Sequence, residues 1–415
     1  MDARSLPAPP GQHASPSGPR PPSSRCVVVC SLEPTGPTRR RIQILVDELV
    51  ALDPSLRVLF VEPAVDVPQR LARRQVAGLG RPRLTSVSPQ LAVLRPRKWL
   101  PRLVGPFADW SLSHQVERAV RRLDLDEPIL WLNDAGYARW AVGTGWAVLY
   151  DVTDDWLLAS MPRRVLTRLR RDEELLLDRA DAVVVCSPEL ARTKGRRRAV
   201  DLVPNAVDVT RFRRPSPRPG DLPGPPTAVY VGTLHRDRLD LPLLDELASA
   251  LPDVSVVLVG PSNLGRADTD ELCRHPNVSL LGARPYDDVP AYFQHADVVV
   301  VPHLVNPFTE TLDPIKAYEC LAAGRPTVTT PVAGFRELGA PITLADRSEF
   351  VGAVRRAVAA PPGAAEVGPP SPRPPGTLQH PAPDAAIPTW TDRARAMARL
   401  IEQARVSRGE PGQGS

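Results

Sequence analysis

Lys316 and Glu319 are the two residues of this sequence whose types and spacing point most directly to chemistry. They lie in DPIKAYECLAAG, a segment with the helix starters Asp313 and Pro314 at one end and the helix stop Gly324 at the other. Residues three apart project from neighbouring positions on one helix face. A lysine in the first turn is disfavoured by the partial positive charge of the helix N-terminus unless an anion binds there. A phosphate at the helix start and a diol bonded to the glutamate would together describe a nucleoside diphosphate.

The alternative is that Lys316 and Glu319 form an intrahelical ion pair and bind no ligand. The position of the helix favours the ligand, because it begins just beyond a predicted strand, where backbone N–H groups can receive a phosphate. The choice of residue adds weak support, because the chain contains 49 Arg and only three Lys.

Short apolar runs alternate with helix-length segments along nearly the whole chain, a pattern typical of parallel α/β architecture. The first set comprises CVVVC (26–30), RVLFVE (57–62), LAVLRP (91–96), PILWLN (128–133), AVLYDV (147–152) and AVVVCS (182–187). The second set comprises TAVYVGT (227–233), VSVVLVG (254–260), VSLLG (278–282), DVVVVPH (297–303), PTVTT (326–330) and ITLA (342–345). Runs this apolar suit strands covered on both faces. We therefore expect two doubly wound Rossmann-like domains, in which ligands bind beyond the carboxyl ends of the strands.

Pro-rich segments and a final helix complete the predicted organisation. The segment that begins PPGAAEVGPPSPRPPG shows neither helix nor strand period. After it, Trp390, Ala394, Met397 and Ile401 form the apolar stripe of a helix that we expect to pack back across the interdomain region. The predicted parts are a disordered N-terminus (1–25), an N-terminal domain (26–212), a Pro/Arg-rich linker (213–226), a C-terminal domain (227–360), a second linker (361–388) and the C-terminal helix (389–407).

Carboxylates gather where two strands of the first set end. Asp134 follows PILWLN, while Asp151 and Asp155 lie at and after the end of AVLYDV. A carboxylate at such a strand end could orient or deprotonate a hydroxyl group, so these three are the predicted catalytic residues. Aspartates are also common helix caps and turn formers, which is the alternative for each of them.

The segment around Lys316 resembles the donor-binding signature of GT-B glycosyltransferases. The stretch PIKAYECLAAGRP, followed by the strand TVTT, is most similar to bacterial enzymes of the glycogen-synthase-like, family-four type. VGTLHRDRLDLPLLDEL, LGARPYDDVPAYFQHADVVVVPH and VPNAVDVTRF resemble further segments of this family. LYDVTDDW resembles a segment of a subgroup concerned with cell-wall or capsular polysaccharides. The resemblance covers about residues 26–405.

The resemblance implies transfer of a sugar from a nucleotide-diphosphate donor to a glycan, lipid-linked or small-molecule acceptor. The N-terminal domain would be the acceptor side and the C-terminal domain the donor side, with Lys316 and Glu319 on the diphosphate and ribose. The implied donor-binding residues are Gly232, Thr233, Arg236, Arg284, Tyr286, Pro314, Ile315, Lys316 and Glu319. A simple tight turn is the alternative for Gly232, and a solvated loop is the alternative for Arg236.

One family feature is missing from this chain. Many of these enzymes carry two glutamates separated by seven residues, and the first touches the donor sugar. That position is Thr311 here, and Glu310 is one residue off, so the family's sugar contact cannot be carried over. The resemblance further implies no metal, no cofactor beyond the nucleotide-sugar co-substrate, and retention of the anomeric configuration.

The net charge of +5 is unevenly spread, because residues 70–103 carry nine Arg or Lys and no acid. No recognised nucleic-acid motif accompanies these charges, whereas Trp99 and Leu100 beside them favour contact with an anionic membrane surface. A solvated basic face is the alternative. The sequence shows no membrane-spanning run, no signal-peptide stretch and no disulfide framework among its five cysteines. We therefore expect a cytoplasmic protein with a peripheral contact at the inner face of the membrane and no nucleic-acid partner.

Two other functions stay open at this point. A nucleotide-sugar 2-epimerase of the same fold would need an acid/base set around the sugar, and the sequence shows no comparable His/Glu cluster. A non-catalytic nucleotide-binding GT-B scaffold protein is compatible with the missing first glutamate and the Pro-rich ends. Turnover with an acceptor would exclude the scaffold, and release of free epimer without acceptor would indicate the epimerase.

Overall fold

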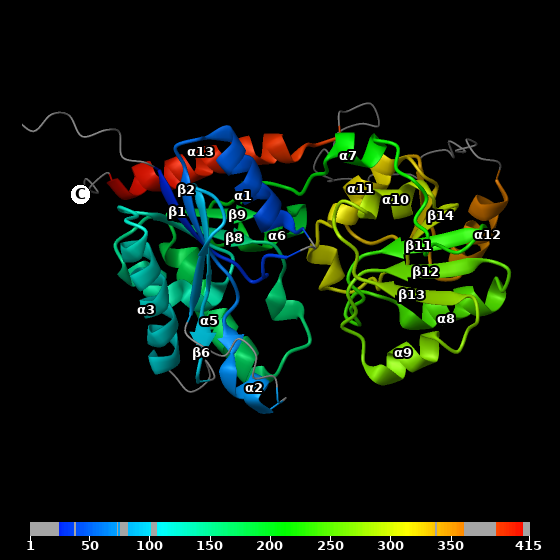
Figure 1. The fold of residues 1–415 in the computed structure, drawn as a ribbon, viewed down its shortest axis with the longest axis horizontal. Helices are drawn as coiled ribbons and strands as arrows, with labels where there is room; N and C mark the ends of the chain where they lie inside the picture. The colour runs from blue at the N-terminus through cyan, green and yellow to red at the C-terminus, as the bar shows by residue number, and fades with distance from the viewer. Residues whose placement is uncertain are drawn as a thin grey trace, which may run out of the picture.

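The computed structural model describes residues 25–36, 39–72, 74, 82–100, 106–336, 338–360 and 387–409. They form two α/β domains that lie beside each other (Figure 1). The predicted N-terminus 1–25 and the second predicted linker 361–388 fall almost entirely outside the described residues. None of the described helices is long and apolar enough to cross a bilayer.

The N-terminal domain is built on an eight-stranded sheet with the order β10-β9-β8-β7-β1-β2-β5-β4. Its strands are β1 (Cys26–Cys30), β2 (Arg57–Val61), β4 (Arg83–Ser86), β5 (Leu91–Arg95), β7 (Ile129–Leu132), β8 (Val148–Val152), β9 (Ala182–Val185) and β10 (Asp201–Leu202). All pairs are parallel except β4 with β5. The predicted strands are confirmed, whereas two were missed: β4, because its sequence RLTS is polar and mostly exposed, and β10, because it has only two residues and both are exposed.

Both faces of this sheet are covered, as the apolar strands require. In β1, Val28 packs into one core, while Val27 and Val29 pack into the other. The helices α1 (Arg41–Leu52) and α13 (Trp390–Gly409) cover one face, and α3 (Pro106–Arg122), α4 (Ala138–Gly143), α5 (Arg163–Arg179) and α6 (Pro188–Lys194) cover the other. A short two-stranded sheet, β3 (Val65–Asp66) with β6 (Arg97–Lys98), and helix α2 (Val67–Ala72) lie at one end of the domain.

The C-terminal domain has a six-stranded parallel sheet with the order β13-β12-β11-β14-β15-β16. Its strands are β11 (Thr227–Val231), β12 (Ser255–Val259), β13 (Val278–Gly282), β14 (Val298–Val301), β15 (Thr327–Thr329) and β16 (Ile342–Leu344). One face is covered by α8 (Leu241–Ala250), α9 (Arg266–Leu272) and α12 (Phe350–Ala359), and the other by α7 (Val209–Arg213), α10 (Val289–Gln294) and α11 (Ile315–Ala323). Val207 and Phe212 belong to this core, although the predicted boundary at 212 assigns them to the other domain.

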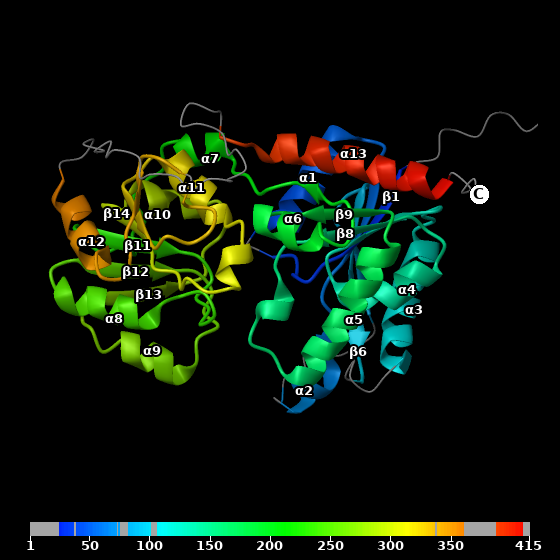
Figure 2. The ribbon, with the colours of Figure 1, turned by 180° about the vertical axis from the view of Figure 1, so that it is seen from behind.

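The predicted C-terminal helix leaves the C-terminal domain and packs back along the N-terminal domain (Figures 1 and 2). Its apolar stripe, from Trp390 to Ile401, packs with α1 and the sheet in one core. The Asp392 amide donates to Thr389 Oγ1 at 3.3 Å, so Thr389 caps the helix. The Val207 amide donates to the Pro388 carbonyl at 3.2 Å, which places the two chain crossings between the domains side by side.

Candidate functional site

The carboxyl ends of the two sheets face each other, and direct contacts join them. Arg238, which follows β11, donates through Nη2 to Asp154 Oδ1, which follows β8, at 3.1 Å. The Ser187 hydroxyl at the start of α6 donates to the Thr311 carbonyl at 2.6 Å. The edges at which doubly wound sheets bind ligands therefore lie against each other, and the residues along them form the candidate site.

Lys316 reaches from the first turn of α11 to the carboxyl end of β11. Its Nζ donates a hydrogen bond to the Val231 carbonyl and lies 4.5 Å from the centre of the Tyr230 ring. The carbonyl and the aromatic face stabilise a cation at a position that the helix dipole disfavours. Among the described residues no direct ion pair joins Lys316 to Glu319, although the charge of Lys316 opposes the rise that burial causes in the pKa of Glu319.

Two glycines make room for this lysine. Gly232 follows β11 with a φ of +153°, and a Cβ there would lie 2.3 Å from Lys316 Nζ and 3.1 Å from Tyr230 Oη. Gly260 follows β12 with a φ of +145°, and its Cβ would lie 2.1 Å from the Gly232 carbonyl oxygen. A side chain at Gly232 would be strained by this backbone conformation and would displace the Lys316 ammonium. The glycine therefore does more than form a tight turn.

Glu319 is half-buried, and its carboxylate makes no hydrogen bond or ion pair with any described residue. Burial raises the pKa of Glu319, and the charge of Lys316 opposes that shift. Tyr286 is close enough to Glu319 for the two groups to interact. Burial is the main cause of the raised pKa of the Tyr286 phenol, and the negative charge of Glu319 is the second cause. The guanidinium of Arg211 lies 4.8 Å from the centre of the Tyr286 ring. An uncommitted carboxylate in this setting can accept hydrogen bonds from vicinal hydroxyls.

His303 is a buried histidine that lies beside Tyr230, the residue whose ring Lys316 contacts. The residue follows β14, is 5% exposed, and has Nε2 at 3.3 Å from Tyr230 Oη. Burial, and then the charges of Lys316 and Arg238, hold the pKa of His303 well below its usual value. The imidazole is therefore neutral at physiological pH, and the positive charge of the site comes from Lys316 and Arg238.

Two predicted donor-binding residues have partners of their own. Arg236 pairs with Asp268 at 2.8 Å and its side chain is 72% exposed. Arg284 pairs with Asp221, and its Nε donates to a tyrosine hydroxyl at 2.9 Å. The structure brings neither guanidinium into contact with Lys316, so their roles in donor binding stay predictions.

Three other predicted residues form the framework of the site. The Thr233 carbonyl accepts a hydrogen bond from Tyr230 Oη at 3.4 Å. Pro314 is the N-cap of α11, and a Cβ on Gly334, where φ is +83°, would lie 2.5 Å from its Cδ. Ile315 packs against the core of the N-terminal domain. The start of α11 is thus held by both domains.

Two of the predicted catalytic aspartates cap short 3-10 helices. Asp134 caps the short 3-10 helix η2 (Ala135–Tyr137) by accepting from a backbone amide at 2.8 Å. Asp155 caps η3 (Trp156–Leu158) in the same way and accepts from Lys194 Nζ at 3.1 Å. Both arrangements match the alternative that the sequence left open, and their catalytic roles stay predictions.

Asp151 begins a buried polar chain that crosses between the domains. Its Oδ2 accepts from Trp131 Nε1 at 3.0 Å, and its Oδ1 lies 3.8 Å from Arg41 Nη2. Arg41 Nη1 donates to Asn205 Oδ1 at 3.1 Å, and Asn205 donates through its backbone and side-chain amides to Asp313. Burial raises the pKa of Asp151, and Arg41 opposes that shift. The chain fixes the start of α11 against the N-terminal domain.

Glu33 is a carboxylate near the site that the sequence analysis missed. It lies between β1 and α1, and its Oε1 accepts from Arg40 Nη1 at 2.7 Å. Burial raises the pKa of Glu33, Arg40 opposes the shift, Asp154 adds to it, and Arg238 of the other domain opposes it further. Its place just after the strand CVVVC was the only sequence signal for it.

The position of the missing family glutamate is buried. Thr311 is 2% exposed, and its Oγ1 donates to the Phe308 carbonyl at 2.7 Å. Glu310 pairs with Arg336 at 2.6 Å. In the described structure, Thr311 has no carboxylate to offer, and Glu310 forms its ion pair with Arg336 and not with Lys316.

Several basic side chains of the stretch 70–103 form ion pairs or are buried within the N-terminal domain. Arg95 pairs with the buried Glu62, Lys98 pairs with Asp66 at 2.7 Å, and the Arg97 side chain is 6% exposed. The described part of this stretch therefore does not offer the continuous positive surface that its sequence suggests.

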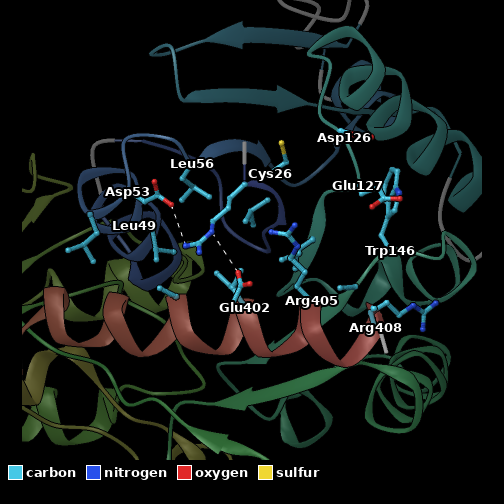
Figure 3. A pocket seen from close by; sticks show the side chains of 18 of the residues that line it. Cys26, Leu49, Asp53, Leu56, Asp126, Glu127, Trp146, Glu402, Arg405 and Arg408 are labelled. Atoms are coloured by element: carbon cyan, nitrogen blue, oxygen red, sulfur yellow. Dashed lines mark ion pairs between the residues drawn. The ribbon is translucent and has the colours of Figure 1, made fainter. Parts of the chain in front are cut away.

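A separate cavity of about 410 Å³ lies at the amino ends of β1 and β7, between the end of α1 and α13 (Figure 3). Its lining includes Cys26 and Ile129, which begin β1 and β7. Arg25 bridges Asp53 at 3.7 Å and Glu402 at 3.8 Å across it. Because this cavity adjoins the amino ends of the strands, it is not part of the interdomain site.

Residues 225–359 match a family model described as Glycosyl transferases group 1, and they include both Lys316 and Glu319. The chain is also 29% identical over 222 residues to a protein of Bacillus subtilis (strain 168) that is assigned to teichuronic acid biosynthesis as the glycosyltransferase TuaH. That match covers 48% of this chain and 55% of the relative, so it spans only about half of each protein.

Solved structures resemble the chain over nearly its whole length. Sucrose-phosphate synthase from Thermosynechococcus elongatus has a TM-score of 0.61 and 18% identity, covering 93% of this chain and 98% of that one. Anabaena HepE in complex with UDP and glucose has a TM-score of 0.56 and 15% identity, covering 92% and 97%. The chain has the GT-B fold. The predicted GT-B architecture is thereby confirmed, and residues 225–359 are similar to the group 1 glycosyl transferases.

Proposed function

We propose that this GT-B protein is a glycosyltransferase that uses a nucleotide-diphosphate sugar as its donor. The observation that carries the proposal is the half-buried, unpartnered carboxylate of Glu319 one helical turn from Lys316. Leaving a carboxylate partly buried without a partner costs free energy. A bound ligand that donates hydrogen bonds to the carboxylate would offset this cost. The Lys316 ammonium lies where a Cβ on residue 232 would come within 2.3 Å of it.

In this proposal the donor lies against the start of α11. Lys316 and the first backbone N–H groups of the helix would hold the diphosphate and stabilise the charge that develops on it as the glycosidic bond breaks. Glu319 would accept hydrogen bonds from the ribose hydroxyls, with Tyr286 near the base. Uracil is the base to test first, because HepE was solved with UDP and glucose.

The acceptor hydroxyl would enter from the N-terminal domain. Glu33 lies there; burial raises its pKa, and the charges of Arg40 in its own domain and Arg238 in the other domain oppose that shift. We propose a glycan or lipid-linked acceptor, in keeping with the teichuronic acid assignment of the relative TuaH. Retention of configuration without a metal is proposed from the family resemblance, and unchanged turnover in EDTA would support the second part.

The decisive experiment supplies UDP-, GDP-, ADP- and dTDP-sugars with candidate acceptors and follows nucleoside diphosphate release and sugar transfer. We expect one donor class to turn over, Lys316→Ala and Glu319→Gln to lower the rate, and the control Glu310→Gln to leave it unchanged. Equal turnover by all variants would overturn the assignment of the site. Release of free epimer would indicate an epimerase, and nucleotide binding without turnover of any donor would indicate a scaffold protein.

A further inference from the structure

We propose that one edge of the N-terminal domain, formed by the starts of α3 and α5 and the end of β6, docks on an anionic lipid bilayer. This edge lies at the bottom of Figures 1 and 2, beside α2, whereas α13 and the chain crossings between the domains lie at the top. The proposal rests on the surface alone and does not depend on the donor chemistry proposed above.

Exposed aromatic side chains form a ladder on the outer face of α3. Phe107 is 63% exposed and Trp110 is 57% exposed, and their rings stack with centroids 5.4 Å apart. His114 continues the stack, with its ring 5.4 Å from that of Trp110. The opposite face of the helix supplies Leu112 and Val116 to the core, so the ladder is not part of the packing that holds α3 in place. Large exposed apolar groups that gather in this way mark interaction surfaces.

A second exposed apolar group extends the ladder around the end of β6. Trp99 is 57% exposed and Leu100 is 38% exposed. The Arg97 backbone exchanges hydrogen bonds with the Gln115 side chain of α3 at 2.8 and 2.9 Å, which fixes β6 against that helix. Tryptophans concentrate at the membrane–water interface, where their amphipathic rings lie at headgroup level.

Two arginines without ion-pair partners in the described part of the chain lie at the start of α5, the helix that an ion pair joins to α3. Arg168 in α5 forms a two-pronged ion pair with Asp109 in the first turn of α3, at 2.7 and 2.8 Å, which joins the two helix starts. Arg163 and Arg164, at the exposed beginning of α5, have no ion-pair partner among the described residues. Asp109 is neutralised by Arg168, so the edge as a whole carries positive charge. Arginine side chains beside aromatic ones suit a headgroup layer that contains anionic phospholipids.

This surface differs from the one that the sequence suggested. The charges of the basic stretch are largely paired or buried, whereas Arg163 and Arg164 come from a segment outside it. The exposed aromatic rings favour a bilayer over a nucleic acid, because no nucleic-acid motif accompanies them. Docking by this edge would leave the chain crossings and α13 on the side that faces away from the membrane.

Flotation of the full-length protein with vesicles tests the proposal. One set of vesicles contains phosphatidylcholine alone, and the other contains phosphatidylglycerol as well. We expect binding to the anionic vesicles that weakens with salt. The double variant Arg163→Gln/Arg164→Gln should lower the partition coefficient about 30-fold. Phe107→Ser/Trp110→Ser should lower binding to a similar degree and make the residual binding more salt-sensitive.

A matched control substitutes side chains of the same kinds on α13. Val406 is 52% exposed, and Arg399 is exposed without an ion-pair partner among the described residues, so Arg399→Gln/Val406→Ser should bind like the wild type. Melting temperatures would verify that all variants are folded. No vesicle binding by the wild type, equal binding by all variants, or an equal loss in the control would overturn the proposal. Binding to a duplex oligonucleotide but not to vesicles would overturn it as well.

Discussion

The two edges that bound the interdomain site use their charged side chains differently. On the C-terminal edge, Glu319 has no partner and Lys316 is held by a carbonyl and an aromatic ring. On the N-terminal edge, Asp151 and Asp155 accept hydrogen bonds from an indole and a lysine inside the domain. A carboxylate with protein partners contributes to the fold, whereas a partly buried carboxylate without a partner is more readily available to a ligand. Substitutions on the two edges should therefore affect different measurements.

The largest effect that this comparison predicts is on stability, at the N-terminal edge. Asp151→Asn removes the negative charge beside Arg41 and leaves a buried guanidinium without its counter-charge. We expect the free energy of unfolding to fall by about 3 kcal/mol, with nucleotide affinity unchanged. Urea denaturation and calorimetric titration measure the two quantities. A selective loss of nucleotide affinity in this variant would mean that Asp151 reaches the ligand.

The next largest effect is on binding, at the C-terminal edge. Gly232→Ala places a methyl group on Lys316 Nζ and imposes a φ that alanine rarely adopts. We expect the affinity for a nucleoside diphosphate to fall about 100-fold. Gly224→Ala is the control, because a Cβ there meets nothing within 4 Å. Wild-type affinity in Gly232→Ala would show that the close approach of residue 232 to Lys316 is not needed for nucleotide binding.

Removing the ammonium alone should have a smaller effect. Lys316→Ala deletes hydrogen bonds between charged groups, so we expect about a 30-fold loss of affinity for a nucleoside diphosphate. Affinity for the nucleoside without phosphates should change little. Titration with both ligands separates the two effects, and an equal loss for both would place Lys316 away from the diphosphate.

Glu319→Gln should weaken binding about tenfold and stabilise the free protein by about 1 kcal/mol. Burial raises the pKa of Glu319 in the folded state, so the folded protein retains a proton that the unfolded chain releases as the pH rises. Stability is therefore lost as the pH rises from the unfolded pKa through the folded one, and Gln removes that loss. Melting temperatures of both proteins between acid and neutral pH measure the effect. A lower melting temperature of the variant at pH 7 would contradict it.

The smallest effect is expected for Arg236, which the sequence placed in the donor site. Its exposed side chain pairs with Asp268, and such pairs contribute at most about 1 kcal/mol. We expect Arg236→Gln to leave both nucleotide affinity and melting temperature close to those of the wild type. A tenfold loss of affinity would support the predicted contact of this arginine with the donor.

The sequence was sufficient for the architecture because most predicted strands are apolar, and those such as β1, β7 and β14 are buried at every position. Strand β4 escaped notice because RLTS carries no such pattern. The start and end of α11 followed from local residues, since Pro314 caps it and Gly324 adopts the left-handed conformation at its end.

The partners within the site could not be predicted, because they are far apart in the sequence. The contact of Lys316 with the end of β11 spans 85 positions, and the pairing of Asn205 with Asp313 spans 108. Periodicity and spacing carry no information about such contacts. An Asp at a strand end looks the same in the sequence whether it binds an indole of its own domain, as Asp151 does, or a ligand.

The central claim is that the C-terminal edge binds the nucleotide while the N-terminal edge holds the fold together. The most direct test is calorimetric titration of UDP, and of the other nucleoside diphosphates, into the wild type, Glu319→Gln and Asp151→Asn, with the melting temperature of each. Our account predicts weaker binding with a higher melting temperature for Glu319→Gln, and unchanged binding with a lower melting temperature for Asp151→Asn. Wild-type binding by Glu319→Gln together with lost binding by a fully folded Asp151→Asn would contradict it.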